Sequence, residues 1–174
     1  MVQIALLTAV TCVLAPISIP LAGNVPISLA TFAVMLSGAL LGAGGGAVSQ
    51  ILYLLIGMAG VPVFAGWTAG AGKLLGVTGG YLIGYVPMAF AIGFIYSRFR
   101  RKNTDIPVLI PALIAGDIVL YVLGTAWFMV QSGMNLQASL AACVIPFIPG
   151  DILKMIAVCI AVPPIAGAIR RFTA

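Results

Sequence analysis

Long apolar runs separated by short connections dominate this sequence and leave it very little surface that could face water. Hydrophobic residues make up 63% of the 174 positions and charged residues only 6%, whereas soluble domains carry about 25% charged residues. Because a lipid bilayer satisfies no backbone hydrogen bonds, apolar runs of this length cross it as helices. The sequence therefore predicts an all-α integral membrane protein.

The apolar runs divide the chain into six segments that we expect to cross the membrane. A span needs roughly 20 residues, so six spans use about 120 and leave only short loops. We therefore expect a six-transmembrane-helix bundle that forms one membrane domain over residues 1–174. The expected spans are Val2–Ile17, Ser28–Leu41, Gly45–Met58, Tyr81–Ser97, Ile106–Val130 and Ile152–Ile169.

Three connections between these spans carry residues that interrupt helices. Pro16–Pro26 contains Pro, Gly and Asn, and Gly60–Gly80 is rich in glycine yet apolar. Irregular backbone survives at membrane depth only where protein covers it or where it lines a cavity. Gly60–Gly80 is therefore predicted as a re-entrant or capping loop and as a candidate binding element. Gln131–Gly150 is expected to hold a short interfacial helix around Leu136–Val144.

Basic residues gather between the fourth and fifth spans and at the C-terminus. They are Arg98, Arg100, Arg101, Lys102, Arg170 and Arg171. Six spans place both groups on one side of the membrane, which the positive-inside rule makes cytoplasmic. We therefore expect a multi-pass cell-membrane protein with both termini in the cytoplasm and the glycine-rich loop outside. This topology accounts for the net charge of +5, so no nucleic-acid partner is expected.

Three charged residues do not follow from this topology: Lys73, Asp151 and Lys154. A charge at the bilayer centre costs about 2.5–3.5 kcal/mol, so such residues usually face a cavity and pair with one another. Asp151 and Lys154 are spaced i and i+3 at the start of the sixth span and share one helix face. One interpretation is a capping acid with a lysine that reaches the interface. The other, which we favour, is a polar clamp at the floor of an outward-facing cavity.

Other polar and aromatic residues could line such a cavity. Gln50 and Tyr53 lie on the third span, and Phe64 and Trp67 lie in the glycine-rich loop. Small-molecule sites combine aromatic side chains with a few polar groups, although each residue alone is more often core or interface. Asp117 lies within the fifth span. It either accepts a hydrogen bond from the hydroxyl group of Tyr121 one turn away or belongs to a polar site.

Features of enzymes are missing from the sequence. It contains no histidine and only three acidic residues, too few for a zinc or two-metal centre. The segment before Lys73 resembles a phosphate loop only superficially, because Trp67 and Leu74 replace the required glycine and hydroxyl residue. We therefore predict neither enzymatic activity nor a cofactor.

Six short motifs stand out along the chain: ISIP at 17–20, VPIS at 25–28, SQxxYLLxG at 49–57, GVPVFAG at 60–66, GxTGGYLxG at 76–84 and DxxK at 151–154. They resemble motifs of the BioY family, the biotin-specific S components of energy-coupling-factor transporters. The resemblance runs from the first span to the sixth, and the block at 49–84 is its most specific part. Val77 departs from the family, in which proline is common at that position.

The resemblance implies a six-helix fold with a biotin pocket near the outer face, closed by the loops after the first and third spans. It implies that Asp151 and Lys154 contact biotin and places Lys73 at a polar position of the loop. It also implies that Ala5 and Ala9 pack on a transmembrane coupling subunit, which works with two ATPase subunits. Small residues spaced by four are typical of close helix contacts.

The chemistry of biotin is compatible with these residues. Asp151 can accept hydrogen bonds from the ureido N–H groups, and Lys154 can donate to acceptor oxygens. Lys73 could meet the carboxylate, and the sequence does not decide which lysine takes which end. Three alternatives stay open at this point: an S component for another vitamin, a structural or channel-like subunit, and a transporter that works without an ATPase.

Overall fold

The computed structural model describes residues 1–19, 26–100 and 105–173, and the side chains up to residue 169. Arg101 and Lys102 of the predicted basic cluster lie outside the described residues, as do the side chains of Arg170 and Arg171. The helices are α1 (Val2–Leu14), α2 (Ala30–Met58), α3 (Ala71–Leu75), α4 (Gly79–Phe99), α5 (Ile106–Ser132), α6 (Leu136–Cys143) and α7 (Ile148–Thr173). Two short strands, β1 (Ser18–Ile19) and β2 (Ile27–Ser28), lie between α1 and α2.

The long helices have the length and composition of membrane spans. Within the described residues, α2, α4, α5 and residues Ile148–Ile169 of α7 are each long and apolar enough to cross a bilayer, and α1 is a shorter apolar helix. The predicted class, a helical integral membrane protein, is confirmed at this level. The predicted interfacial helix around Leu136–Val144 corresponds to α6.

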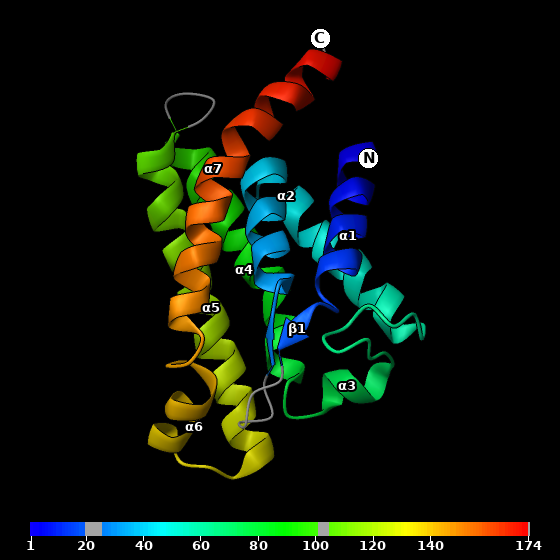
Figure 1. Ribbon diagram of the computed structural model, residues 1–174, viewed down its shortest axis with the longest axis vertical. Coiled ribbons are helices and arrows are strands. Elements are labelled where there is room, and N and C mark those ends of the chain that lie inside the picture. The colour runs from blue at the N-terminus through cyan, green and yellow to red at the C-terminus, as the bar shows by residue number, and fades with distance from the viewer. Residues whose placement is uncertain (20–25, 101–104, 174) are drawn as a thin grey trace.

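Helix α2 contains a sharp break at Gly42, between the second and third predicted spans. The backbone there has φ 74° and ψ −176°, a region that only glycine occupies readily. Figure 1 shows the chain turning back on itself within α2. The Gln50 amide nitrogen donates to Ser37 Oγ at 3.1 Å, which joins the segments before and after the break. Gly42 therefore allows α2 to fold into two packed segments.

The core lies where α4 packs between α2 and α5. Its largest fully buried side chains include Tyr53, Met88, Ile92 and Leu113, which come from these three helices. α1 packs on α2, and α7 contacts α2 and α5. In the most apolar 18-residue stretch of α7, only 11% of the residues are buried inside the protein, whereas 61% are buried in the corresponding stretch of α4. Most of α7 therefore faces the surroundings of the bundle, and its buried residues stand out.

The short elements gather at one end of the bundle and the termini at the other. Figure 1 shows the β1–β2 pair, α3 and α6 at the end opposite both termini. The strands are antiparallel and pair Ser18 with Ser28 and Ile19 with Ile27. This pairing was not predicted from the sequence. It holds Ser28 in place directly before α2, at the end of the molecule where α7 begins.

Candidate functional site

An ion pair lies on the opening turns of α7. Lys154 Nζ is 2.9 Å from Asp151 Oδ1, and the two residues are only 8% and 3% exposed. The helix begins at Ile148, four residues before the predicted span, because Pro149 fits the first turn, where an N–H is not needed. Asp151 thus lies in the first turn of α7, where an acid also suits the helix dipole.

Two residues from other helices complete the cluster around this ion pair. Lys154 Nζ donates to Thr31 Oγ1 of α2 at 2.8 Å, and the Thr31 hydroxyl donates to Asp151 Oδ1 at 3.3 Å. The hydroxyl of Tyr121 on α5 donates to Asp151 Oδ2. The carboxylate thus connects α2, α5 and α7. Charge-assisted hydrogen bonds of this kind are about twice as strong as neutral ones.

The hydrogen bond from Tyr121 to Asp151 rules out one of the two roles that the sequence suggested for Asp117. Asp117 was a candidate acceptor for this hydroxyl because it precedes Tyr121 by one helical turn. The hydroxyl instead reaches across to α7 and binds Asp151. Asp117 is buried on α5, and its Oδ1 has no hydrogen-bond partner in the described part of the chain.

A pocket lies directly against the cluster. It is lined by Pro26, Ser28, Thr31, Tyr81, Tyr85, Leu120, Tyr121, Phe147, Asp151 and Lys154. Small-molecule sites combine apolar walls with a few polar groups in the same way. The cluster of charges and hydroxyls thus forms the polar part of a mainly aromatic and aliphatic cavity.

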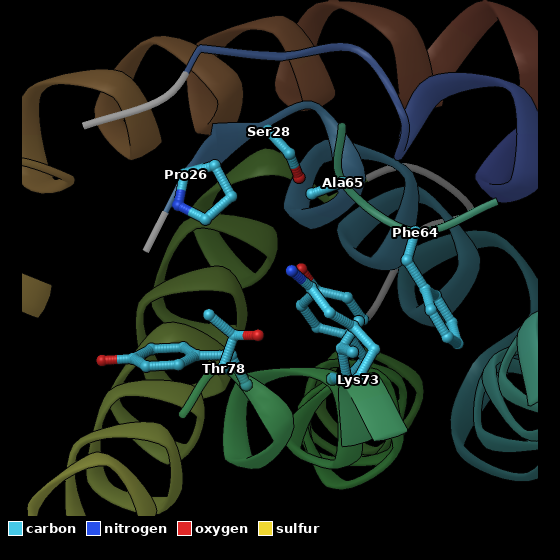
Figure 2. Close-up of a pocket in the computed structure, with 9 residues that line it drawn as sticks. Pro26, Ser28, Phe64, Ala65, Lys73 and Thr78 are labelled. Carbon is cyan, nitrogen blue, oxygen red and sulfur yellow. The ribbon is translucent and has the colours of Figure 1, made fainter. Parts of the chain in front are cut away.

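A second pocket adjoins the first and is lined in part by Lys73. The two share Pro26, Ser28, Tyr81 and Tyr85 as lining residues. Figure 2 shows this second pocket, with the Lys73 side chain extending from α3 toward Ser28 and Ala65. Both pockets thus contain charged side chains: Asp151 and Lys154 line the first, and Lys73 lines the second.

Two other predicted site residues hold the loop after α2. The Tyr53 hydroxyl donates to the carbonyl oxygen of Val63 at 3.2 Å. The Phe64 ring packs edge-on against Tyr53 at 5.6 Å between centroids. A Cβ at Gly57 would lie 2.1 Å from Phe64 Cζ, so the ring occupies space that only glycine leaves free. Phe64 is among the residues that line the second pocket, while Figure 2 shows its ring directed away from Lys73.

Gln50 and Trp67 lie outside both pockets. Gln50 is buried and bonds Ser37 across the break in α2. Trp67 is 67% exposed and has φ 58°, an uncommon value for a residue other than glycine. That these two residues and Tyr53 contact a ligand stays a prediction.

Ala5 and Ala9, the predicted partner interface, lie on the exposed side of α1. The opposite side packs on α2, where Thr8 Oγ1 lies 3.1 Å from Ser49 Oγ. Close packing within the bundle therefore does not account for the two alanines, and their face is free to contact another helix.

Comparison with known proteins places this fold in a family. The profile of the BioY family matches residues 1–171. The chain belongs to the BioY family. The biotin transporter BioY of Rhodobacter capsulatus is 38% identical over 147 residues, which cover 80% of this chain and 77% of that protein. The biotin transporter BioY2 of Lactococcus lactis is 36% identical over 157 residues, which cover 90% and 84%.

A solved structure has the same fold as this BioY family member. It is described as the S-component for biotin from an ECF-type ABC transporter and superposes with a TM-score of 0.83. The two chains are 32% identical, and the match covers 92% of this chain and 87% of the other. The predicted family is therefore confirmed, and the family is one of transporters rather than enzymes.

Thr31, Ser28, Tyr85 and Tyr121 line the candidate pocket but were not predicted as site residues from the sequence. Ser28 belongs to the VPIS motif, which could have marked it. The other three residues carry no distinguishing signal, since hydroxyl side chains are common in membrane helices.

Proposed function

We propose that this protein is the substrate-binding subunit of an energy-coupling-factor transporter and that it captures biotin at the cell membrane. The observation that carries the proposal is the buried Asp151–Lys154 pair beside a mainly apolar pocket. Membership of the BioY family and the likeness to the S-component for biotin support the choice of ligand.

The polar groups of the pocket match the two ends of biotin. Asp151 accepts hydrogen bonds from the ureido N–H groups, and Lys154 donates to the ureido oxygen. The apolar ring system packs against Tyr81 and Tyr85 of α4, which line both pockets. Lys73 then meets the carboxylate, because its ammonium lies in the adjoining pocket.

We further propose a topology of six spans with both termini in the cytoplasm. The break at Gly42 supports counting α2 as two spans, and α1 supplies another despite its length of 13 residues. Arg98 and Arg100 lie at the C-terminal end of α4, and Arg100 lines a pocket with Ala166 and Ile169 near the C-terminus. These basic residues support a cytoplasmic location for that end of the bundle. The pocket, which lies toward the other end, then opens to the outside.

Transport by this subunit would require partners. We propose that the face of α1 with Ala5 and Ala9 binds a transmembrane coupling subunit, which in turn is driven by two ATPase subunits. The exposure of both alanines supports this assignment. Membrane lipid would cover the rest of the apolar outer surface.

Isothermal titration of the purified protein with a panel of vitamins tests the ligand. We expect saturable binding of biotin and no binding of thiamine or riboflavin. Biotin methyl ester, which lacks the carboxylate, should bind more weakly to the parent, and Lys73→Met should remove that difference. Saturable binding of another vitamin but not of biotin would contradict the proposed ligand. The protein would then be an S component for that other vitamin.

A further inference from the structure

A buried carboxyl oxygen without a hydrogen-bond partner among the described residues lies inside the membrane-spanning part of the molecule. Asp117 is 4% exposed, and its Oδ1 has no hydrogen-bond partner within the described residues. Buried polar atoms are satisfied in the large majority of cases, and an exception needs an explanation. Such an acidic side chain is stable as a carboxylate only where a cation lies beside it, since charges inside membranes pair with one another.

The direction of the helices brings Asp117 and Lys154 to the same level. α5 and α7 contact one another and run in opposite directions (Figure 1). The Tyr121–Asp151 hydrogen bond fixes their relative height. From that bond, Asp117 lies four residues away on α5 and Lys154 three residues away on α7, in the same direction along the bundle. At 1.5 Å per residue, these offsets are about 6 and 4.5 Å.

Other observations agree with this placement. Asp117, Tyr121 and Asp151 line one groove between α5 and α7. Ile148 and Ile152 of α7, on either side of Asp151, line the same groove. The position of Asp117 on α5 is thus close to the ion pair, although no hydrogen bond joins them in this structure.

Lys154 can change partners without leaving the site. Its ammonium group carries three N–H donors, and two of them point at Asp151 Oδ1 and Thr31 Oγ1. The flexible four-carbon stem of lysine allows the ammonium group to move while its backbone stays fixed. A ligand N–H that binds Asp151 Oδ1 would compete with Lys154 and Thr31 for the same oxygen.

We propose that Asp117 is the alternative partner of Lys154 and receives its ammonium group when a ligand occupies Asp151. In the ligand-free state, Lys154 neutralises Asp151 and keeps that carboxylate in place. In the bound state, the Lys154 ammonium group lies between Asp117 and the ligand oxygen and donates to both. Asp151 then accepts hydrogen bonds from the ligand N–H groups. Asp117 is thus a positioning residue, and this use of it rests on the proposed capture of biotin.

A stability cycle on the ligand-free protein tests the pairing by itself. Asp151→Asn removes the charge that holds Lys154, as a ligand would, so Lys154 should turn to Asp117 and the thermal midpoint should fall little. In Asp117→Asn/Asp151→Asn, Lys154 is buried without any carboxylate. The midpoint should then fall on the order of 10 °C further than the two single changes added together. Additive losses would overturn the pairing.

A matched control uses Ser139, whose Oγ is also buried without a hydrogen-bond partner among the described atoms. Ser139→Ala lies on α6, away from Lys154, so its effect should add to that of Asp151→Asn. A coupling of the same size with Ser139 would attribute the effect to general loosening of the bundle and overturn the assignment to Asp117.

A binding cycle tests whether the ligand uses this exchange. Asp117→Asn should weaken biotin binding by roughly 10- to 100-fold, because a hydrogen bond to a charged group is lost in the bound state. In the Lys154→Met background, the same change should alter affinity less than twofold. An equal loss in both backgrounds would mean a structural role for Asp117, and so would affinity unchanged by Asp117→Asn alone. A parent protein that fails to bind biotin would refute the proposed function, whereas the stability cycle would still decide the pairing.

Discussion

Replacing Asp151 tests whether its carboxylate binds the ligand or only supports the start of α7. The residue is 3% exposed and accepts hydrogen bonds from Lys154, Thr31 and Tyr121. Asp151→Ala would leave the ureido N–H groups of biotin without an acceptor in an apolar pocket. Truncating one partner of a buried charged contact costs about 2–5 kcal/mol. At 1.4 kcal/mol per decade, affinity should fall by roughly 30-fold to several thousandfold.

More conservative variants of the ion pair should weaken biotin binding to different extents. Asp151→Asn keeps an oxygen that can accept a hydrogen bond, so it should weaken binding less than Asp151→Ala. Lys154→Met keeps the apolar stem but removes the donor and should cost about as much as Asp151→Ala. Tyr96→Phe is the control, since the Tyr96 hydroxyl binds the backbone of Asp105 at the far end of the bundle. It should leave affinity unchanged.

Titration of biotin into folded variants, checked by size-exclusion chromatography, separates the two interpretations of Asp151. If Asp151 acts only at the helix terminus, its loss should cost about 1 kcal/mol of stability and leave affinity almost unchanged. A change in affinity of less than threefold for both Asp151→Ala and Lys154→Met would refute the clamp. The binding site would then have to be sought elsewhere in the bundle.

Three further predictions concern topology, assembly and the break in α2. Cysteines introduced at Arg100 and Ala69 in a cysteine-free background should be labelled from opposite sides of the membrane, and labelling from one side would contradict the six-span topology. Ala5→Trp combined with Ala9→Trp should abolish assembly with a coupling subunit in a pull-down while biotin still binds, because bulk separates closely packed helices; intact assembly would place the interface elsewhere. Gly42→Ala should destabilise the protein by about 1–3 kcal/mol, measured as a lower thermal midpoint, because its backbone conformation is strained for any other residue.

The membrane class and the positions of several helices follow from composition because lipid tolerates so few arrangements of the backbone. The predicted span Tyr81–Ser97 differs from α4 by two residues at each end, and Ile106–Val130 differs from α5 only at its C-terminal end. The β1–β2 pair could not be foreseen in this way. Each strand has only two residues, too few to show alternation of polar and apolar side chains.

The charged part of the site was predictable, but its partners were not. Asp151 and Lys154 stand out because a charge within an apolar run must be paired. That requirement does not say which hydroxyl groups complete the pair. Thr31 is separated from Asp151 by 120 residues and Tyr121 by 30, and each is an ordinary residue of its helix. Only the packing of α2 and α5 against α7 brings them to the carboxylate.

Tyr53 and Phe64 show that residues of a motif near a pocket can also hold the wall of that pocket. Both lie in the family-like block at 49–84, yet the Tyr53 hydroxyl binds the Val63 carbonyl and the Phe64 ring fills the space left by Gly57. These contacts fix the loop that follows α2, and this loop contributes Phe64 and Ala65 to the wall of the second pocket. The aromatic residues thus shape the pocket by holding its wall in place. A residue pattern alone cannot separate this role from direct contact, because both require large side chains at fixed positions near the loop.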